Sequence, residues 1–395
     1  MFTNSKKPSI RFSKVLDDAK RITMLIGINV MERKFVYKPL TCLTIVLLTI
    51  FMSFSIFTVA REAYTSADWK SCLKYCVLVG SGGQCVSRLE TGIVKHSNMR
   101  RLALFCQLLY AKYEKMGGEY ERELGKCVDA VERVIKLIRL GYFVIFASLL
   151  GLPIILWLTD GPRYLVLQYH IPGIDPDTNT GFYLTNVVQM VTIVIAGVGL
   201  YAGDLYVLIF LIQARLFSLV LKLRVADINA LLEPENNKIN ELAITRELQS
   251  IVRWHQLYLK YNDIVNDLTH YVVATQVLTS AMSTTISIFI MLTSEPWPMG
   301  YFYLPLSYYS LIVYCILGTQ IEYDNDEICY EMYNISWYRM TVNQRKMVRL
   351  MIMASQQPKT YKIMSVIPLT VSTALEMTRI IYSLSMMISN TEQSK

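Results

Sequence analysis

The chain contains 395 residues, of which 53% are hydrophobic and 18% are charged, and its formal net charge is +8. This composition is too apolar for a soluble domain and too charged for a chain that lies in lipid throughout. We attribute the excess of positive charge to loops on the cytoplasmic side of a membrane. Because no arginine-rich tract with interleaved aromatic residues occurs, we expect no nucleic-acid partner.

Seven hydrophobic stretches divide the chain, at residues 39–59, 70–88, 135–158, 186–213, 268–293, 300–320 and 362–388. Most of them reach the ~20 residues that a helix needs to cross a bilayer. They predict an all-α polytopic membrane protein with seven transmembrane helices, in a single membrane domain over residues 1–395. The second stretch contains Lys74, Gln84 and a glycine cluster. We count it as a crossing because the basic loop after it would otherwise face outward.

The basic residues are distributed unevenly between these stretches. Nine of them precede the first stretch and more lie between residues 88 and 139, whereas the loop 159–185 contains only Arg163 and the loop 293–300 contains none. Lysine and arginine accumulate in cytoplasmic loops, so we expect a cytoplasmic N-terminus and an extracellular C-terminus. This orientation is the reverse of that of a G-protein-coupled receptor. A transporter would more often show inverted repeats and broken helices, which we do not find.

The polar segments between the crossings have a helical pattern of their own. Residues 97–139 and 240–267 place apolar residues at helical spacing and charges on the opposite face. We therefore expect the membrane helices to continue into a cytoplasmic helical base formed by residues 89–134, 214–267 and 321–361. A glycosylation sequon at Asn334 falls in this base and is expected to stay unmodified.

The sequence contains no recognisable catalytic motif: a P-loop, GxSxG and HExxH are all missing. Cysteines and histidines lack metal-site spacing, so we expect neither an enzyme nor a cofactor. Few ionisable residues lie at membrane depth, where each costs ~2.5–3.5 kcal/mol on insertion scales. Asp204 lies near the inner interface, and we interpret it as a solvated or packed interfacial carboxylate in preference to a functional one. Glu376 and Arg379 are i, i+3 neighbours, which fits a local salt bridge or a charge at a pore mouth.

The last stretch carries a face of small and hydroxyl-bearing side chains. Its members recur every three or four residues, and they are Ala374, Thr378, Ile381, Ser385 and Ser389. Small residues allow close packing between membrane helices. Hydroxyl groups can also line a water-filled path, where they replace part of the hydration of an ion. The sequence leaves both uses open.

The outer halves of the second, third, fourth and sixth stretches are rich in aromatic and aliphatic residues. A small apolar ligand needs a concave apolar cavity with one or two hydroxyls to orient it, and tyrosine supplies both the ring and the hydroxyl. Tyrosine and tryptophan also form interfacial belts, so packing stays an alternative for each residue. The candidate ligand-binding residues are Leu73, Val77, Phe143, Phe146, Ala147, Leu150, Met190, Ile193, Val194, Tyr301 and Tyr308.

Short motifs in the last fifth of the chain resemble the C-terminal signature of insect odorant receptors. They are Cys315 and Gly318, the run from Tyr333 to Tyr338, the run from Ala354 to Pro358, Pro368–Leu369 and Tyr382–Ser383. The length, the seven helices and the cytoplasmic N-terminus resemble that family over the whole chain. Ala374 departs from the pattern, since the family usually has a phenylalanine eight residues before the Tyr-Ser pair.

This resemblance implies an odorant-gated, non-selective cation channel that works as a tetramer with the family's shared co-receptor. The loop 214–267 lacks the long insertion typical of that co-receptor, so the chain resembles an odour-tuned subunit. The implied partners are a small volatile organic ligand, the co-receptor in a heterotetramer, membrane lipid and permeating cations. The implied location is the plasma membrane of olfactory sensory neuron dendrites. A gustatory receptor channel and a G-protein-coupled receptor are the alternatives.

The resemblance also implies roles for individual residues. In the family, the last helices surround a central pore whose gate lies toward the outer end. The gate region carried onto this sequence comprises Thr378, Ile381, Ser385 and Ser389. The odour pocket lies in the outer leaflet among the second, third, fourth and sixth helices, where the candidate ligand-binding residues lie. The cytoplasmic helices form the anchor through which subunits associate, and its residues are Tyr333, Trp337 and Tyr338.

Overall fold

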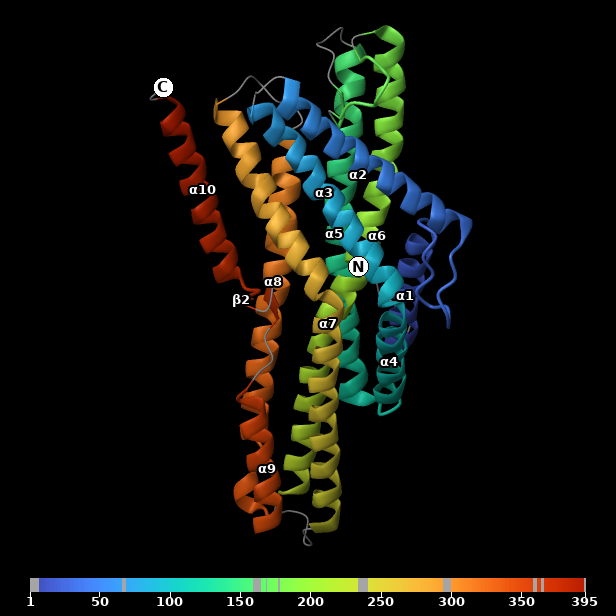
Figure 1. Cartoon of the computed structure of the whole chain (residues 1–395). Coiled ribbons are helices and arrows are strands. Elements are labelled where there is room, and N and C mark those ends of the chain that lie inside the picture. Colours follow the sequence, from blue (N-terminus) through green and yellow to red (C-terminus); the bar gives the residue numbers. More distant parts are fainter. Residues whose placement is uncertain are drawn as a thin grey trace.

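The computed structural model describes the chain except for residues 1–6, 66–68, 159–164, 168, 177, 234–240, 294–299, 358–360, 364–365 and 394–395. The described residues form a long bundle of helices (Figure 1). Helices α6, α7 and α8 run along most of its length, and α2 and α3 lie across its upper half. Helix α10 lies at one edge, and its C-terminal end is at the top of the view.

The described elements, in chain order, are α1 (Pro8–Met24), α2 (Pro39–Thr65), α3 (Trp69–Val94), α4 (His96–Glu114), α5 (Gly118–Leu158), α6 (Asn179–Leu231), α7 (Glu241–Thr293), α8 (Gly300–Tyr333), a 3-10 turn η1 (Trp337–Arg339), α9 (Val342–Ser355), β1 (Lys362–Ile363), β2 (Ile367–Pro368) and α10 (Val371–Gln393).

Local sequence signals explain several of these boundaries. Helix α1 begins at Pro8, a position where proline loses no hydrogen bond because its N–H would be unsatisfied in any case. Thr178 caps α6, since its hydroxyl oxygen accepts from the Gly181 N–H at 3.1 Å. At the start of α9, Thr341 and Gln344 form a reciprocal capping box.

Within the described part of the chain, five helices are long and apolar enough to cross a membrane, namely α2, α5, α6, α7 and α8. Each of them covers one of the predicted stretches. Helices α3 and α10 cover the other two and do not meet the same criterion. Lys74 and Arg88 lower the hydropathy of α3, and Glu376 and Arg379 lower that of α10. A helical membrane fold is confirmed, and the seven crossings with their orientation stay predictions.

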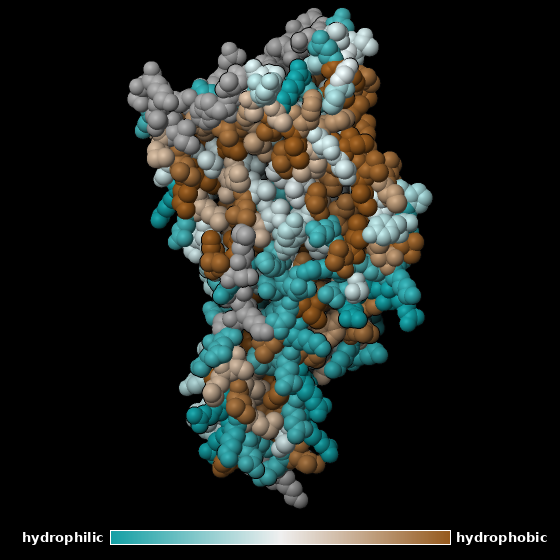
Figure 2. Space-filling view, viewed as in Figure 1, coloured by the Kyte–Doolittle hydropathy of each residue, from teal (hydrophilic) through white to brown (hydrophobic). Residues whose placement is uncertain are grey.

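Several helices extend well beyond the apolar stretches. Helices α6 and α7 have 53 residues each, which at ~1.5 Å per residue is about 80 Å. The hydrocarbon core of a bilayer is only ~30 Å thick. Figure 2 shows the consequence on one face, where hydrophobic residues dominate the upper half and hydrophilic residues the lower half. The segment 89–134 is not one helix, because Gly117 and Gly118 adopt positive φ angles of 68° and 54° and separate α4 from α5.

The prediction for the last stretch was wrong at its beginning. Instead of a helix from residue 362, the chain forms a short antiparallel pair in which Lys362 faces Pro368, and α10 begins only at Val371. Proline cannot donate a backbone hydrogen bond and disfavours helical conformation in the residue before it. Thr370 then caps the new helix by accepting from the Thr373 N–H at 3.3 Å.

The lower half is held together by an aromatic core between α6 and α7. The Phe217 ring lies 5.0 Å from that of Trp254 and 4.8 Å from that of Tyr261, centroid to centroid. The Trp254 indole donates to the Phe217 carbonyl at 3.1 Å, and the Tyr261 hydroxyl donates to the Phe210 carbonyl at 2.7 Å. Large aromatic side chains whose polar atoms are satisfied stabilise such a core strongly.

Candidate functional site

A compact apolar cluster occupies the upper half of the bundle, and we call it the upper cluster. Its side chains come from α2, α3, α5, α6, α7, α8 and the α5–α6 connection. Its buried members are Phe51, Val77, Leu78, Leu149, Val166, Leu167, Tyr169, Ile193, Phe289, Ile290 and Tyr303. The sequence predicted walls from four of these helices, and the structure adds α2 and α7.

The structure brings together about half of the predicted ligand-binding residues. Those that belong to the upper cluster or pack against it are Leu73, Val77, Phe146, Leu150, Met190 and Ile193. The exposed ones are Phe143, Ala147, Val194, Tyr301 and Tyr308. Residues 143, 146, 147 and 150 of α5 lie on neighbouring sides of the helix, and of these four only Phe146 and Leu150 pack against the cluster. Ligand binding by any of them stays a prediction.

A segment of the α5–α6 connection, residues 165–167 and 169–171, closes the upper cluster, and we call it the roof. The Gln189 side chain on α6 is fully buried beneath it. Its amide oxygen accepts from the Leu167 N–H, and its amide nitrogen donates to the Tyr169 carbonyl, both at 3.0 Å. The His170 N–H donates to the Thr58 hydroxyl of α2 at 2.9 Å. The roof backbone is therefore held to two helices.

Gln189 is a functional candidate that the sequence analysis missed. It is the kind of residue that stands out in an apolar stretch, since a buried amide must be hydrogen-bonded. Its partners are backbone groups of the roof, and no motif marks such groups in a sequence. Tyr303 is one of several aromatic residues at the start of the sixth stretch, and it is buried in the cluster, whereas the selected candidate Tyr301 is exposed.

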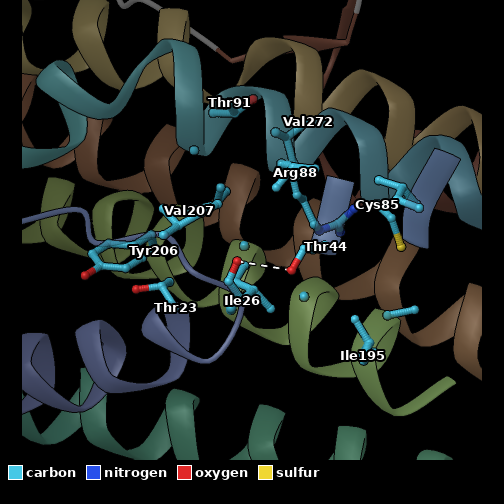
Figure 3. A pocket seen from close by; sticks show the side chains of 18 of the residues that line it. Thr23, Ile26, Thr44, Cys85, Arg88, Thr91, Ile195, Tyr206, Val207 and Val272 are labelled. Carbon is cyan, nitrogen blue, oxygen red and sulfur yellow. Dashed lines mark hydrogen bonds between the residues drawn. The ribbon is translucent and has the colours of Figure 1, made fainter. Parts of the chain in front are cut away.

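A cavity of about 70 Å³ lies between α2, α3, α6 and the α1–α2 connection and adjoins the upper cluster at Phe51 (Figure 3). Its lining is almost wholly apolar and includes Ile26, Cys85 and Ile195. The Thr44 hydroxyl donates to the Ile26 carbonyl at 3.3 Å at its edge. None of the predicted ligand-binding residues lines it. Its volume is well below the ~300–1,000 Å³ of typical small-molecule sites.

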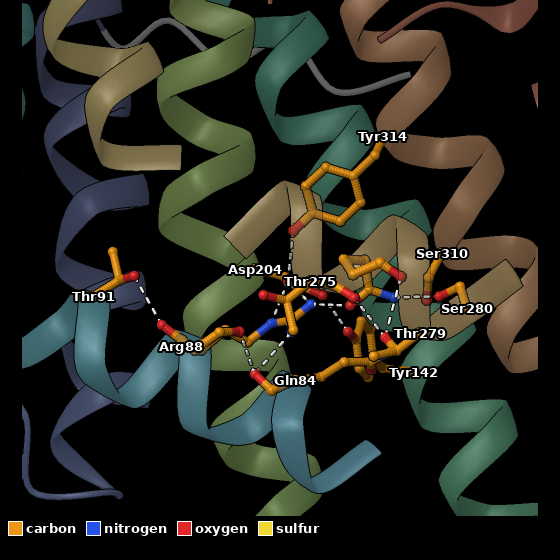
Figure 4. A network of polar contacts seen from close by, with 12 residues as sticks. Gln84, Arg88, Thr91, Tyr142, Asp204, Thr275, Thr279, Ser280, Ser310 and Tyr314 are labelled. Carbon is orange, nitrogen blue, oxygen red and sulfur yellow. Dashed lines mark hydrogen bonds and ion pairs between the residues drawn. The ribbon is translucent and has the colours of Figure 1, made fainter. Parts of the chain in front are cut away.

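A buried polar network joins five helices beside this cavity, whose lining includes Arg88 (Figure 4). Asp204 of α6 and Arg88 of α3 are 3% and 5% exposed. The Arg88 Nε and Nη2 atoms lie 2.6 and 2.5 Å from the Asp204 Oδ1 atom. The hydroxyls of Tyr142 on α5 and Tyr314 on α8 also donate to this carboxylate, the second at 2.7 Å. Arg88 donates as well to the Gln276 amide oxygen on α7 at 2.5 Å.

The network corrects one expectation and settles another. Arg88 was counted among the basic residues of a cytoplasmic loop, but it lies inside the bundle. Of the two interpretations of Asp204, the packed carboxylate is right and the solvated one is wrong. Gly203 makes the approach of α3 possible, since a Cβ added there would lie 2.7 Å from the Arg88 Cβ. Arg88 and Asp204 are paired with each other and hydrogen-bonded to side chains of three further helices. The network therefore fixes the relative positions of five helices.

The hydroxyl-bearing face of α10 packs within the subunit against α7 and α8. Ala374 and Ser385 are fully buried and Ile381 is 4% exposed. The Ser385 hydroxyl donates to the Ile381 carbonyl at 2.8 Å, and the Thr378 hydroxyl donates to the Ala374 carbonyl at 2.7 Å. This is the arrangement that the packing alternative predicts. The Ser389 side chain lies outside the described residues, and a pore-lining role for this face stays a prediction.

The predicted anchor residues lie at the lower end of the bundle. Tyr333, Trp337 and Tyr338 are all exposed. Their loop is fixed to α6 by Asn229, whose amide donates to the Asn334 carbonyl at 3.0 Å and accepts from the Ser336 N–H at 2.8 Å. The aromatic side chains are thus presented on a defined surface, and their part in subunit association stays a prediction.

Comparisons with known proteins identify the family. The sequence model of the 7tm Odorant receptor family matches residues 84–382. The chain is 33% identical over 401 residues to putative odorant receptor 83c of Drosophila melanogaster, covering 98% of this chain and 99% of that protein. The chain therefore belongs to the insect odorant receptor family, as its C-terminal motifs indicated.

Solved structures confirm the fold. The olfactory receptor OR5 from Machilis hrabei in complex with eugenol superposes with a TM-score of 0.77, at 13% identity over 96% of this chain and 99% of that one. A second structure of the same receptor gives a TM-score of 0.76 at 13% identity, over 96% and 98% of the two chains. At this identity the likeness concerns the fold alone.

Proposed function

We propose that this protein is an odour-tuned subunit of a ligand-gated, non-selective cation channel, in which a small volatile organic molecule binds within the upper cluster. The observation that carries the proposal is the convergence of apolar side chains from six helices beneath a roof whose backbone is hydrogen-bonded in place. Such a site excludes water and recognises shape. Membership of the odorant receptor family, rather than of the gustatory or G-protein-coupled receptors, supports it.

Helix α8 is the element through which we propose that binding opens the channel. It contributes Tyr303 to the upper cluster and Tyr314 to the buried network. Between them, the Tyr308 hydroxyl lies 3.5 Å from the Thr378 hydroxyl of α10. A ligand shifts an equilibrium only by its differential affinity for the two states. A molecule that favours one position of α8 would therefore also favour one position of α10, the proposed pore helix.

We further propose that the protein crosses the plasma membrane of olfactory sensory neurons seven times, with its N-terminus in the cytoplasm, and assembles with the odorant co-receptor as a heterotetramer. The exposed aromatic residues at the lower end, Tyr333, Trp337 and Tyr338, support association there, because exposed aromatic side chains are enriched at protein interfaces. Their position on the base leaves the upper cluster free to respond to ligand.

The test is whole-cell current in cells that express this chain with and without an insect odorant co-receptor, exposed to a broad panel of volatile molecules while G-protein signalling is blocked. The expected result is a fast cation current that requires both chains. Signals that disappear with the G-protein block, or no response in either pairing, would overturn the channel proposal.

A further inference from the structure

The face of α10 that points away from the bundle carries a line of polar residues. The members, which recur at intervals of four, three, four and seven residues and are all exposed, are Ser372, Glu376, Arg379, Ser383 and Asn390. These intervals keep them on one side of a helix. The buried hydroxyl-bearing face of Ala374, Ile381 and Ser385 lies on the opposite side. We call these five residues the outward polar line.

The outward polar line lies at the depth of the apolar part of α8. The Val371 N–H donates to the Thr319 hydroxyl of α8 at 2.8 Å, and Thr378 meets Tyr308. The first turns of α10 therefore run beside residues 308–319, inside a stretch predicted to cross the membrane. At ~1.5 Å per residue, Arg379 lies about 12 Å beyond Val371. In the predicted crossing, Glu376 and Arg379 thus lie about 8 and 12 Å inside the inner end of a ~30 Å hydrocarbon core.

Among the described residues, neither charge is in an ion pair that would offset its cost there. An unpaired charge facing lipid costs ~2.5–3.5 kcal/mol on insertion scales, and such residues normally face a water-filled cavity. The residues beside the line are apolar and exposed: Leu375 and Tyr382 on one side, Ile380 and Met387 on the other.

We propose that the outward polar line faces the water-filled pore where the last helices of the subunits meet, and that Glu376 and Arg379 set its preference among ions. This rests on the channel function proposed above and reassigns the pore surface from the hydroxyl-bearing face to the opposite one. The apolar residues on either side then pack against neighbouring subunits or lipid. Charged side chains that project into a narrow aqueous path attract ions of opposite sign and repel those of the same sign.

The first test compares two serines two residues apart in heteromeric channels with the co-receptor. Ser383 belongs to the outward polar line, whereas Ser385 is buried on the opposite face. We expect a cationic thiosulfonate reagent applied during odorant stimulation to reduce the current of Ser383→Cys and to leave Ser385→Cys unchanged. Wild-type channels control for the native cysteines. Modification of Ser385→Cys alone, or of neither variant, would overturn the proposal.

The second test measures the charges themselves. A charge ~8 Å from an ion in water changes its local concentration by about two-fold. We therefore expect Glu376→Gln to lower single-channel cation conductance by up to about two-fold and Arg379→Gln to raise it by a similar factor. Arg379→Lys keeps the charge and should behave as wild type, which separates electrostatics from misfolding. Glu376→Asp is the corresponding control.

The outcomes separate this inference from the function on which it rests. Wild-type channels that carry odorant-evoked currents, together with unchanged conductance in both glutamine variants, would overturn the pore assignment and leave the channel function intact. Wild-type cells without any odorant-evoked current would overturn the channel function itself, and the pore assignment with it.

Discussion

Two pairs of opposite charges lie in predicted membrane stretches of this protein, and their surroundings are opposite. Arg88 and Asp204 are buried, lie 2.5 Å apart and are hydrogen-bonded to side chains of three other helices. Glu376 and Arg379 are exposed on the outward face of α10, and neither is in an ion pair among the described residues. The first arrangement makes charge compatible with a dry interior by compensating it. The second needs water, which is why we assign it to a pore.

The largest effect is expected from breaking the buried pair. Asp204→Leu leaves the Arg88 charge without its partner, which should cost ~3–5 kcal/mol of stability. Replacing both residues, as Arg88→Met with Asp204→Leu, should recover most of that loss because no uncompensated charge remains. Thermal unfolding of the purified heteromeric complex measures both. If the double variant loses as much stability as the two single variants together, Arg88 and Asp204 do not compensate each other's charge.

The exposed pair supplies the matched control for this experiment. Glu376→Leu should change the same unfolding temperature little, because an exposed residue without an ion pair contributes roughly 0.5 kcal/mol or less. A loss comparable to that of Asp204→Leu would contradict the contrast between the two pairs and place Glu376 in a structural contact.

The hydrogen bonds between the buried Gln189 amide and the roof backbone are uncharged, unlike those of the Arg88–Asp204 network. Gln189→Leu removes these hydrogen bonds. The Leu167 N–H and the Tyr169 carbonyl would each lose a buried partner, at roughly 1–3 kcal/mol apiece. We expect about a tenfold loss of odorant potency, equivalent to ~1.4 kcal/mol, with single-channel conductance unchanged. Val191→Ala, on an exposed face of the same helix, is the control. An unchanged dose–response curve in Gln189→Leu would separate the roof from ligand binding.

Asp324 in the base is intermediate between the two pairs, since it is buried but only partly compensated. Burial raises its pKa to about 6, against the attraction of Arg215 and with added repulsion from Glu327. The Gln320 amide donates to it at 3.1 Å. A carboxyl with a raised pKa in the folded state favours folding while it is protonated. Its contribution is therefore complete below about pH 4 and is lost as the pH rises through about 6.

The expected consequence is a component of stability that decreases between about pH 4 and pH 6, by at most about 3 kcal/mol. Asp324→Asn should remove this component, so that the stability of the variant relative to the wild type increases as the pH rises. Unfolding temperatures of both proteins across that range measure the difference. Parallel curves would show that Asp324 does not titrate in this window.

A smaller effect is expected from a single methyl group in the upper cluster. A Cβ added at Gly197 of α6 would lie 2.7 Å from the Phe146 ring, so that Gly197→Ala must displace this ring. Overpacking of this kind costs typically 1–3 kcal/mol, and we expect odorant potency to shift by several-fold. Gly151→Ala on α5 adds the same methyl group where no atom lies within 4 Å. Equal dose–response curves for the two variants would place Phe146 outside the ligand site.

The contrast between the pairs also shows what the sequence could predict. The apolar stretches predicted the helices, because burial in lipid needs a long apolar segment whatever its neighbours are. The partner of Asp204 was not predictable, since Arg88 is 116 positions away and is indistinguishable in sequence from a basic residue of the adjoining loop. The family motif could be recognised in residues 315–383, and it identified the family without indicating which face of α10 is buried.

The candidate pocket shows a similar limit. Composition brought out the aromatic residues of α5 and α8 and the aliphatic residues of α6, but it does not show which of them reach the cluster. Phe146 packs against the upper cluster while Phe143, three residues earlier, is 71% exposed. The roof depends on hydrogen bonds between Gln189 and backbone groups about 20 residues away. Backbone groups carry no residue-specific signal, so only the structure could reveal this contact.

The smallest effect we predict concerns the contact between the hydroxyls of Tyr308 on α8 and Thr378 on α10. Thr378 already donates to the Ala374 carbonyl, so the Tyr308 hydroxyl acts as the donor to Thr378, at 3.5 Å. A bond at this limit of distance is weak, and Tyr308→Phe should shift odorant potency by about two-fold or less. Thr378→Val removes the acceptor at similar volume, and the double variant should add no further shift. Additive shifts would show that the two hydroxyls act independently, and that this contact does not transmit movement from α8 to α10.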